Sequence, residues 1–355
     1  GKSGPGIYDS VVFPSRKADK ANNPLPWGFA KEQKELTQDE VAFLSQIKTT
    51  SFLVLQDGKI IHESYYGNHK ENTKSNTFSA AKSFIGLLIG IAIDEGHINS
   101  FDDPITDYLD FSAPNDSLVT IRHLLTMSSG LNWVESDANP LSDNAEAYYG
   151  SDLPAIMRDV SFDGEPGKEY VYKSGNSQLL GIILENATGV TATKYLEKQV
   201  WSKINTENDL LWSLDQEGGM EKAFCCIYGT SRDFAKIGQL ILNEGSWNGK
   251  QIISKKTLAA LLQPINKKDR FYGMHFWRYE DPEHPVVLGQ YIIAIPSLNT
   301  VVVRTGHERL DKYKIPESKS NNSSFIDKNQ YKVKHPLDLF QYISTAKRMV
   351  KKSSR

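Results

Sequence analysis

The chain has 355 residues, with 41 Lys and Arg against 43 Asp and Glu, which gives a formal net charge of −2. Apolar residues make up 39% and charged residues 24%, as in an ordinary soluble globular protein. The length supports a core without metal or disulfide staples, and the charge balance gives no electrostatic reason to bind nucleic acid or an anionic membrane. Disordered, collagen-like, basic-tail and disulfide-framework proteins are excluded.

The first predicted elements are an arm, a short helix and a hairpin. Residues 1–36 are rich in Gly, Pro, Lys and Asn and are predicted to be an irregular N-terminal arm. A Thr-x-x-Glu capping box at 37–40 precedes an apolar periodicity and predicts a helix. Apolar stretches on either side of Asp57-Gly58 predict a β-hairpin over residues 51–65.

The middle of the chain is predicted to be mainly helical. Residues 78–96 form the most apolar helix and end at Gly96, so this helix should lie inside the molecule. Its longest apolar run is too short to cross a bilayer. Residues 100–220 mix short helices and loops. Further helices are expected after the capping residues Thr230 or Ser231, and after Ser254.

The pattern then returns to strands. Residues 290–304 predict a second hairpin, 311–334 a polar surface excursion, and 335–351 a closing amphipathic helix. Strands at both ends with helices between them indicate an α+β fold. In it, an antiparallel sheet is built from both chain ends and flanked by helices, with an inserted, mainly helical subdomain. We therefore expect a sheet subdomain from 37–78 and 230–355, and a helical subdomain from 79–229 with the buried helix at the interface.

The two cysteines are adjacent in sequence, at Cys225 and Cys226. Neighbouring cysteines rarely bridge each other, and no third cysteine is present. We therefore expect two buried or semi-buried thiols without a role.

Serine hydrolases that use lysine as a base carry Ser-x-x-Lys at a helix start. The chain has three such pairs, Ser45/Lys48, Ser79/Lys82 and Ser344/Lys347. With 33 Ser and 31 Lys in the chain, chance alone gives roughly three, so only context can choose among them. Two pairs fall in surface-like helices, where solvated polar side chains are the simpler interpretation.

Ser79 differs because it begins the buried apolar helix. Backbone N–H groups at a first helical turn are free, so the Ser79 N–H could donate to an oxyanion. Lys82, three residues on, lies on the same helix face and is the only cation between residues 78 and 93. An apolar setting favours the neutral amine that a general base needs. A capping serine with a snorkelling lysine is the alternative.

A tyrosine could complete the site. Tyr172-Lys173-Ser174 lies at a loop-to-helix junction after the turn Glu165-Pro166-Gly167, where a phenol can point into a cleft. Tyr-x-Ser and Tyr-x-Asn recur elsewhere in the chain, so a buried structural tyrosine is the alternative.

Several stretches in order resemble the serine β-lactamase superfamily. They are Phe78-Ser79-Ala80-Ala81-Lys82-Ser83, the segment 121–131 with its Arg-His-Leu-Leu-Thr-Met-Ser-Ser-Gly-Leu sequence, the tyrosine segment 166–189, and the segments 231–238 and 247–250. The similarity runs from about residue 50 to 305. It is most similar to the branch of class C β-lactamases, related esterases and nylon-oligomer hydrolases.

The resemblance implies roles for the matched positions. Ser79 is the acylated nucleophile, Lys82 its base partner and Tyr172 the proton-shuttling tyrosine. Ser174 takes the place of the polar residue, often Asn, that completes the Tyr-x-Asn motif, and is expected to contact the substrate. The family's Lys-Thr-Gly motif is missing, and the segment 284–290 ends in Gly-Gln as in related esterases. By this resemblance we expect an N–H near Val287 to complete the oxyanion hole.

The sequence therefore predicts a serine hydrolase that hydrolyses a small-molecule ester or amide through an acyl-enzyme. The alternatives are a D-amino-acid peptidase or penicillin-binding-type cell-wall enzyme, and a non-catalytic binding module. The eight histidines are scattered without metal-ligand spacing, so we expect no metal and no cofactor. By resemblance we expect a bacterial protein, periplasmic or secreted, with any export signal absent from a chain that begins at Gly1.

Overall fold

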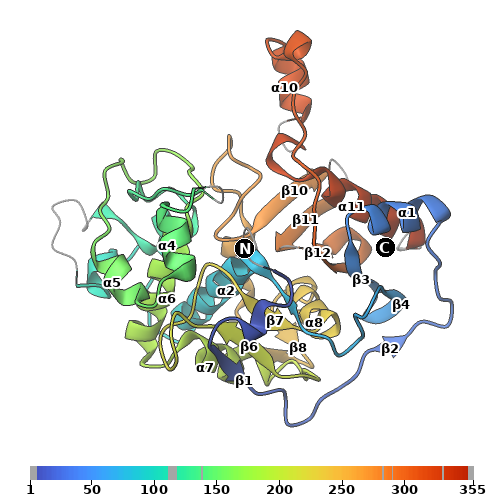
Figure 1. The fold of residues 1–355 in the computed structure, drawn as a ribbon, viewed down its shortest axis with the longest axis horizontal. Coiled ribbons are helices and arrows are strands. Elements are labelled where there is room, and N and C mark those ends of the chain that lie inside the picture. The colour runs from blue at the N-terminus through green and yellow to red at the C-terminus, as the bar shows by residue number, and fades with distance from the viewer. Residues whose placement is uncertain are drawn as a thin grey trace.

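A central helix, α2 (Ala81–Asp94), joins a large sheet to a block of helices and a smaller sheet (Figure 1). The computed structural model describes residues 6–110, 118–136, 139–281, 284–289, 291–329 and 332–350. The other helices are α1 (Gln38–Gln46), α3 (Ile121–Leu125), α4 (Asp143–Tyr149), α5 (Leu153–Arg158), α6 (Ser174–Thr188), α7 (Ala192–Leu196), α8 (Ser231–Leu242), α9 (Lys255–Leu262), α10 (Ser323–Asn329) and α11 (Leu337–Met349). The strands are β1 (Ser15–Ala18), β2 (Gly28–Phe29), β3 (Thr49–Gln56), β4 (Lys59–Tyr65), β5 (Ser75–Asn76), β6 (Leu210–Ser213), β7 (Ile227–Gly229), β8 (Ser246–Trp247), β9 (Lys250–Gln251), β10 (Trp277–Asp281), β11 (His284–Gly289), β12 (Ile292–Ile295) and β13 (Thr300–Gly306).

The large sheet is built from both ends of the chain, as predicted. Among the described residues its strand order is β10-β11-β12-β13-β3-β4-β2. All neighbouring pairs are antiparallel except β2 with β4. The central pair joins β3 to β13, so that Val54 lies opposite Val302. The mixed α+β class predicted from the order of elements is confirmed.

Alternation along the central strands divides the core into two layers. Leu53 and Leu55 of β3 belong to the core that includes α2, whereas Phe52 and Val54 belong to the core against α11. Successive side chains of a strand point to opposite faces, so a strand covered on both faces is apolar throughout. Helix α8 packs on β12 and β13 on the first face, and α1 and α11 cover the second.

The two predicted hairpins form through local turn chemistry. Asp57 and Gly58 have φ of 50° and 71°, and a two-residue turn of this kind matches the twist of the strands β3 and β4. Strands β12 and β13 pair antiparallel across a short 3₁₀ turn, Pro296–Leu298.

The predicted helix caps are also present. The Thr37–Glu40 capping box is present at α1, and Thr230 and Ser254 cap α8 and α9.

The arm, expected to be irregular, contains two short strands. Strand β1 pairs with β6 in the smaller sheet, whose order is β1-β6-β7-β5, and β2 pairs with β4 at the edge of the large sheet. The arm therefore ties the two sheets together along one side of the molecule. Composition did not predict these strands because each is stabilised by backbone hydrogen bonds to a strand far away in the sequence.

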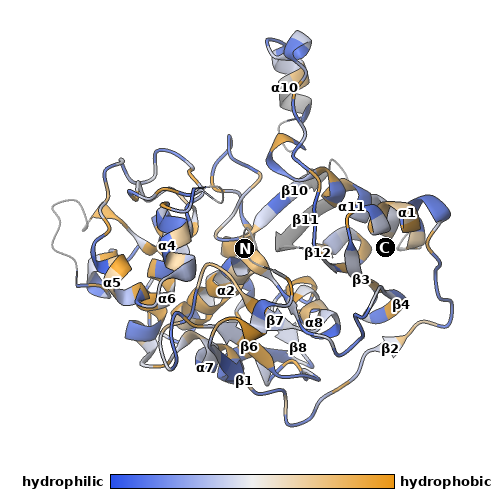
Figure 2. Ribbon diagram, viewed as in Figure 1, coloured by the Kyte–Doolittle hydropathy of each residue, from blue (hydrophilic) through white to orange (hydrophobic). Residues whose placement is uncertain are grey.

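Helix α2 is the buried helix expected from its composition, and it is largely hydrophobic in Figure 2. It packs against α6, α7 and α9. Gly90 lies within α2 where an added Cβ would meet Leu261 at 2.9 Å and Ile253 at 3.0 Å. This close approach brings α2 and α9 together. A 3₁₀ turn, Phe78–Ala80, precedes α2, so Ser79 stands just before the α-helix rather than in its first turn.

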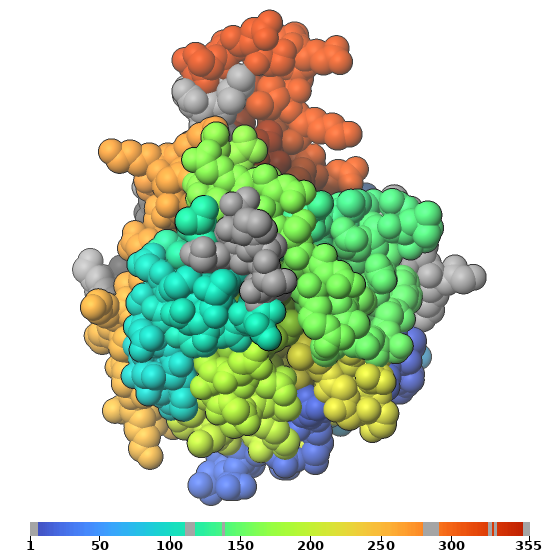
Figure 3. Space-filling view, turned by 90° about the vertical axis from the view of Figure 1, so that its left-hand side faces the viewer, coloured from blue at the N-terminus to red at the C-terminus, as the bar shows by residue number. Residues whose placement is uncertain are grey.

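The predicted polar excursion leaves the body of the molecule and carries α10 at its far end (Figures 1 and 3). Its two ends meet, because Lys312 bridges to Pro336 and the Leu337 N–H donates to the Asp311 carbonyl at 3.1 Å. The short helix within it was not predicted. In the described ranges, no helix combines the length and apolar character needed to cross a bilayer.

Candidate active site

Ser79 is exposed at the end of a tightly held turn. The preceding residue, Phe78, has a φ of 47°, which is unusual for a bulky side chain. Its N–H donates to Asn76 Oδ1 at 2.8 Å, and the Thr77 N–H donates to the Ile227 carbonyl at 2.7 Å. These contacts join the turn to β7. Such strain persists only where the surroundings enforce it, and it is common at functional sites.

Lys82 lies beneath Ser79 and is only 2% exposed. Its Nζ is 3.4 Å from Ser79 Oγ and donates to the Phe224 carbonyl at 2.8 Å. The structure therefore brings an exposed hydroxyl against a buried amine, as the helical spacing predicted. The other two Ser-x-x-Lys pairs have exposed serines on surface helices, Ser45 on α1 and Ser344 on α11.

Tyr172 lies beside this pair. Lys82 Nζ is 5.0 Å from the centroid of the Tyr172 ring. The ring also contacts Trp277, with centroids 5.7 Å apart, and Tyr272 at 6.5 Å. Phe271 and Tyr170 extend this aromatic cluster. The structure thus brings together the three residues chosen from the sequence, Ser79, Lys82 and Tyr172. The aromatic cluster around Tyr172, called the aromatic wall below, was not predicted from the sequence.

Ser174 begins α6, and its polar groups contact a carboxylate that the sequence did not single out. The Ser174 hydroxyl donates to Glu135 Oε1 at 2.6 Å, and its N–H donates to Oε2 at 2.7 Å. The Trp133 indole also donates to Glu135 Oε2, at 2.8 Å. A carboxylate at a helix N-terminus is well placed electrostatically. A substrate contact by Ser174 stays a prediction, and its hydroxyl is engaged with Glu135.

Val287 lies on β11, opposite Arg278 of β10 and Ala294 of β12. Its role as an oxyanion donor stays a prediction. Because β10 and β12 pair with β11 on its two sides, the Val287 N–H can donate to a substrate only if it is not hydrogen-bonded to a neighbouring strand.

His275 is a buried neighbour of the site that the sequence did not indicate. Its Nδ1 is 2.8 Å from the Leu125 carbonyl, and its Nε2 is 2.8 Å from Ser177 Oγ. Its own carbonyl accepts from Ser83 Oγ at 2.7 Å. Burial lowers the pKa of His275 to about 3, although the hydrogen bond to the Leu125 carbonyl acts in the opposite direction. Through its ring, His275 links α3 and α6, and through its carbonyl it contacts α2.

With this geometry in view, the family model described as Beta-lactamase matches residues 36–307. The chain belongs to the Beta-lactamase family. The resemblance predicted from the motifs is therefore confirmed over most of the chain. The match begins just before the capping box of α1 and ends after β13.

Relatives of this Beta-lactamase family chain include a 6-aminohexanoate-dimer hydrolase of Paenarthrobacter ureafaciens, which is 25% identical over 231 residues. That match covers 62% of this chain and 58% of the hydrolase. A Bacillus anthracis protein with the provisional name 6-aminohexanoate-dimer hydrolase superposes with a TM-score of 0.76 at 20% identity. It covers 95% of this chain and 93% of its own. A family VIII carboxylesterase superposes with a TM-score of 0.63 at 17% identity, covering 88% and 96%.

The two cysteines of this Beta-lactamase family chain are bonded to each other as a Cys225–Cys226 disulfide. The expectation of two separate thiols is therefore wrong. Sequence adjacency made a bridge improbable, but Cys226 has a left-handed φ of 71°, which turns its side chain back toward Cys225. The disulfide follows Phe224, whose carbonyl accepts from Lys82.

Cations from the excursion lie over the aromatic wall. Lys334 Nζ is 4.8 Å from the Phe271 ring centroid, and Lys312 Nζ is 5.9 Å from that of Trp277. Burial lowers the pKa of Lys312, and the neighbouring charges of Arg309 and Lys334 lower it further. The excursion thus places two lysine side chains against the aromatic wall that includes Tyr172.

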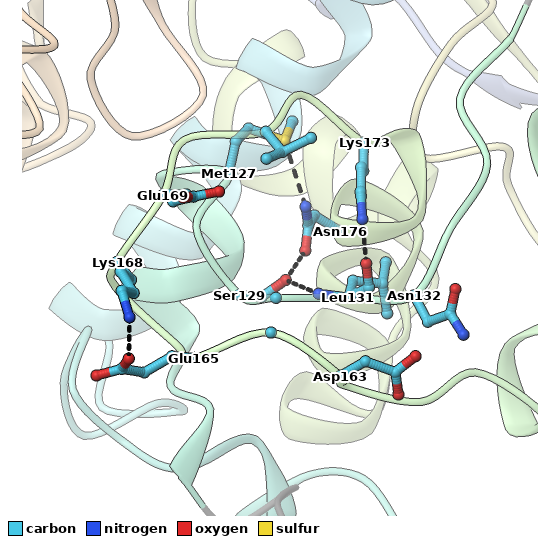
Figure 4. A pocket seen from close by; sticks show the side chains of 13 residues that line it. Met127, Ser129, Leu131, Asn132, Asp163, Glu165, Lys168, Glu169, Lys173 and Asn176 are labelled. Carbon is cyan, nitrogen blue, oxygen red and sulfur yellow. Dashed lines mark hydrogen bonds and ion pairs between the residues drawn. The ribbon is translucent and has the colours of Figure 1, made fainter.

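A separate cavity of about 340 Å³ is lined by neighbours of Tyr172 in the chain, but not by Tyr172, Ser79 or Lys82 (Figure 4). Val171 and Lys173 line it, whereas Tyr172 between them contacts Lys82, because neighbouring residues of an extended segment point to opposite sides. Ser129 and Asn176 also line it, and the Ser129 hydroxyl donates to Asn176 Oδ1 at 2.5 Å. This cavity therefore does not contain the Ser79 chemistry. In the ranges described here, no three His, Cys, Asp or Glu side chains gather as metal ligands would.

Proposed function

We propose that this serine hydrolase of the Beta-lactamase family hydrolyses a small ester or amide through an acyl-enzyme on Ser79. The observation that carries the proposal is the contact of an exposed Ser79 hydroxyl with the buried Lys82 amine, 3.4 Å apart. A nucleophile within reach of a base that is itself held by a third group is the arrangement that activates serine. Here the third group is the Phe224 carbonyl.

In the first step, neutral Lys82 takes the Ser79 proton while Oγ attacks the substrate carbonyl carbon. The Ser79 N–H and an N–H near Val287 would stabilise the oxyanion, and each such donor is worth about 3–4 kcal/mol in enzymes where it has been removed. Tyr172 gives its proton to the leaving alcohol or amine and takes the proton held by Lys82, which returns to its neutral form. Water then hydrolyses the acyl-enzyme, and Ser79 recovers its proton.

The lysine side chains on the aromatic wall indicate which class of ester or amide is preferred. The chain lacks the Lys-Thr-Gly lysine that, by resemblance, would hold a substrate carboxylate, but Lys312 and Lys334 bring positive charge near Tyr172 from another segment. Repulsion among neighbouring cations is relieved by a bound anion. We therefore infer that the preferred small ester or amide carries a carboxylate. One relative is named a 6-aminohexanoate-dimer hydrolase, and the 6-aminohexanoate in that name is a carboxylate, which agrees with this class.

The test combines labelling and turnover. A fluorophosphonate probe should label the wild-type chain and fail to label a folded Ser79→Ala variant. Ser344→Ala is the matched control, because Ser344 belongs to a pair with the same spacing, and this variant should label normally. Persistent labelling of Ser79→Ala would refute the assignment. Absence of label from the folded wild type would favour a binding module.

The substrate is tested by offering short-chain nitrophenyl esters, a chromogenic cephalosporin and D-Ala dipeptides side by side. Ester turnover with little cephalosporin or dipeptide turnover is the expected result. Preferential cleavage of D-Ala dipeptides or muropeptides would replace the proposal with the cell-wall alternative.

We also propose that the protein works outside the cytoplasm. The Cys225–Cys226 disulfide supports this, because such bonds persist in oxidising compartments and are rare in the cytosol. Fractionation of the producing cells tests the location, and recovery of the folded enzyme only from the cytosol would refute it.

A further inference from the structure

We propose that the Cys225–Cys226 disulfide is a positioning element for Lys82, acting through the Phe224 carbonyl, so that acylation of Ser79 depends on this bond. The inference rests on the proposed function, since it assigns the disulfide a role in the same step. Neither cysteine needs to touch the substrate for this role. Cys226 is fully buried and Cys225 nearly so.

The carbonyl of Phe224 controls where the Lys82 amine points. The Nζ–O distance of 2.8 Å is shorter than the 3.4 Å between Nζ and Ser79 Oγ. A neutral amine has two N–H donors and one lone pair. When one N–H is given to Phe224, rotation about the last bond of Lys82 is restricted, and the lone pair can be held toward the Ser79 hydroxyl. Displacement of the Phe224 carbonyl would release that orientation.

Phe224 lies between two fixed points of the chain. On one side, the Ala223 N–H donates to Gln178 Oε1 at 2.9 Å. On the other, the Cys226 carbonyl accepts from the Ser213 N–H at 3.0 Å. The disulfide joins Cys225 to this second anchor, so the peptide after Phe224 cannot turn independently of Cys226. The left-handed φ of Cys226 is a conformation that L-residues rarely keep without such enforcement.

The same segment also holds the turn that presents Ser79. The residue after the disulfide, Ile227, accepts from the Thr77 N–H at 2.7 Å and donates its own N–H to Thr77 Oγ1 at 3.3 Å. Thr77 lies two residues before Ser79. The disulfide therefore belongs to a short segment that contacts both Lys82 and the turn before Ser79. A rearrangement there would alter the distance that acylation requires.

Reduction of this bond is the direct perturbation. A water-soluble phosphine donates an electron pair to the disulfide, the S–S bond breaks, and two protons from solvent complete two thiols. The phosphine is oxidised to its oxide with oxygen from water. Because the chain has two cysteines in all, thiols counted after unfolding report on this bond alone. No thiols are expected in the untreated protein, and two in the reduced protein.

The readout is the second-order rate of fluorophosphonate labelling of the folded enzyme, with near-ultraviolet circular dichroism to confirm that the fold is kept. We expect reduction to slow labelling at least about tenfold, since misplacement of a catalytic group by an ångström can cost about a hundredfold. Mild oxidation with a diazene dicarboxamide should remove two hydrogens from the thiols and restore the rate. Recovery separates a positioning effect from irreversible unfolding.

A double variant makes the test independent of reductant access. Cys225→Ser combined with Cys226→Gly removes the bond and lets Gly adopt the left-handed φ, and it should be as slow as the reduced enzyme and unaffected by phosphine. In a Lys82→Met background, reduction should slow the residual labelling much less than in the wild type, because the contribution made through Lys82 is already lost.

Three results would overturn the role of the disulfide. They are two thiols in the untreated protein, a full labelling rate in the reduced enzyme or the double variant, and an equal slowing by reduction in the Lys82→Met background. Failure of the proposed function looks different, since the untreated, oxidised enzyme would then not be labelled at Ser79 at all.

Discussion

Replacement of Lys82 by Met tests the base assignment most directly. Met is unbranched, apolar and flexible, so it can fill most of the space of the lysine stem while it removes the amine. Lys82 is 2% exposed, and its Nζ lies within hydrogen-bond distance of the Ser79 hydroxyl and the Phe224 carbonyl. The variant therefore leaves the nucleophile in place and removes the group proposed to accept its proton.

The expected loss follows from these contacts. A positioned general base contributes about 10²–10⁴ in rate, which corresponds to about 3–5 kcal/mol of activation free energy. The effect on folding is smaller. The Phe224 carbonyl loses its partner, a cost of about 1–3 kcal/mol, but the variant no longer has to bury an amine, and this offsets part of the cost. We therefore expect a folded protein with acylation slowed at least about a hundredfold.

The assay measures nitrophenyl ester turnover and fluorophosphonate labelling per folded molecule, with a thermal melt in parallel. Lys236→Met is the matched control, because Lys236 is a second buried lysine, 1% exposed, that donates to the Leu25 carbonyl at 3.0 Å, away from Ser79. It should lose stability and keep its acylation rate. A Lys82→Met protein that acylates like the wild type, or an equal loss in both variants, would refute the reasoning.

The other predictions concern stability and specificity. Burial lowers the pKa of His275 to about 3, so the unfolded chain binds its proton first; stability should be full above about pH 6.5 and fall by up to about 1.4 kcal/mol per pH unit toward pH 3. Denaturant melts should show a shallower acid slope for His275→Asn, and an unchanged slope would contradict the prediction. Lys312→Ala should raise KM several-fold for a carboxylate-bearing ester and leave it unchanged for a neutral ester of the same size; an equal change for both would remove the anion preference. Gly130→Ala combines a φ of 75° with a Cβ 2.3 Å from the Gly164 carbonyl oxygen and should cost about 2–5 kcal/mol, whereas Gly58→Ala, at φ 71° with open space, should cost only about 1–2 kcal/mol. Equal thermal shifts for the two glycine variants would show that the close approach is absent.

Features set by nearby residues were predictable from the sequence. The capping box of α1 and the Asp57-Gly58 hairpin depend on atoms only a few residues apart, so their signals are complete within a short window. The Ser79–Lys82 contact also follows from helical spacing, but the choice among three equal spacings needed the apolar context of α2.

Features that depend on distant segments were not predictable. Glu135 lies 39 residues before Ser174, and His275 lies 98 residues after Ser177, so neither contact has a local pattern. The disulfide was missed for the opposite reason. Adjacent cysteines appear unable to bridge unless the backbone takes a rare conformation, and the left-handed φ of Cys226 becomes visible only in the structure.

The pairing of β3 with β13 has a consequence for how the chain acquires its fold. These strands are adjacent in the sheet, with Val54 opposite Val302, yet Ser79, Lys82 and Tyr172 all lie between them along the chain. During synthesis the β3–β4 hairpin emerges early, and one apolar edge of it stays unpaired until β13 (Thr300–Gly306) is available. Pairings between such distant segments close slowly, and an exposed edge is prone to self-association in the meantime. Chains interrupted before β13 are therefore expected to aggregate rather than to accumulate as a soluble helical fragment.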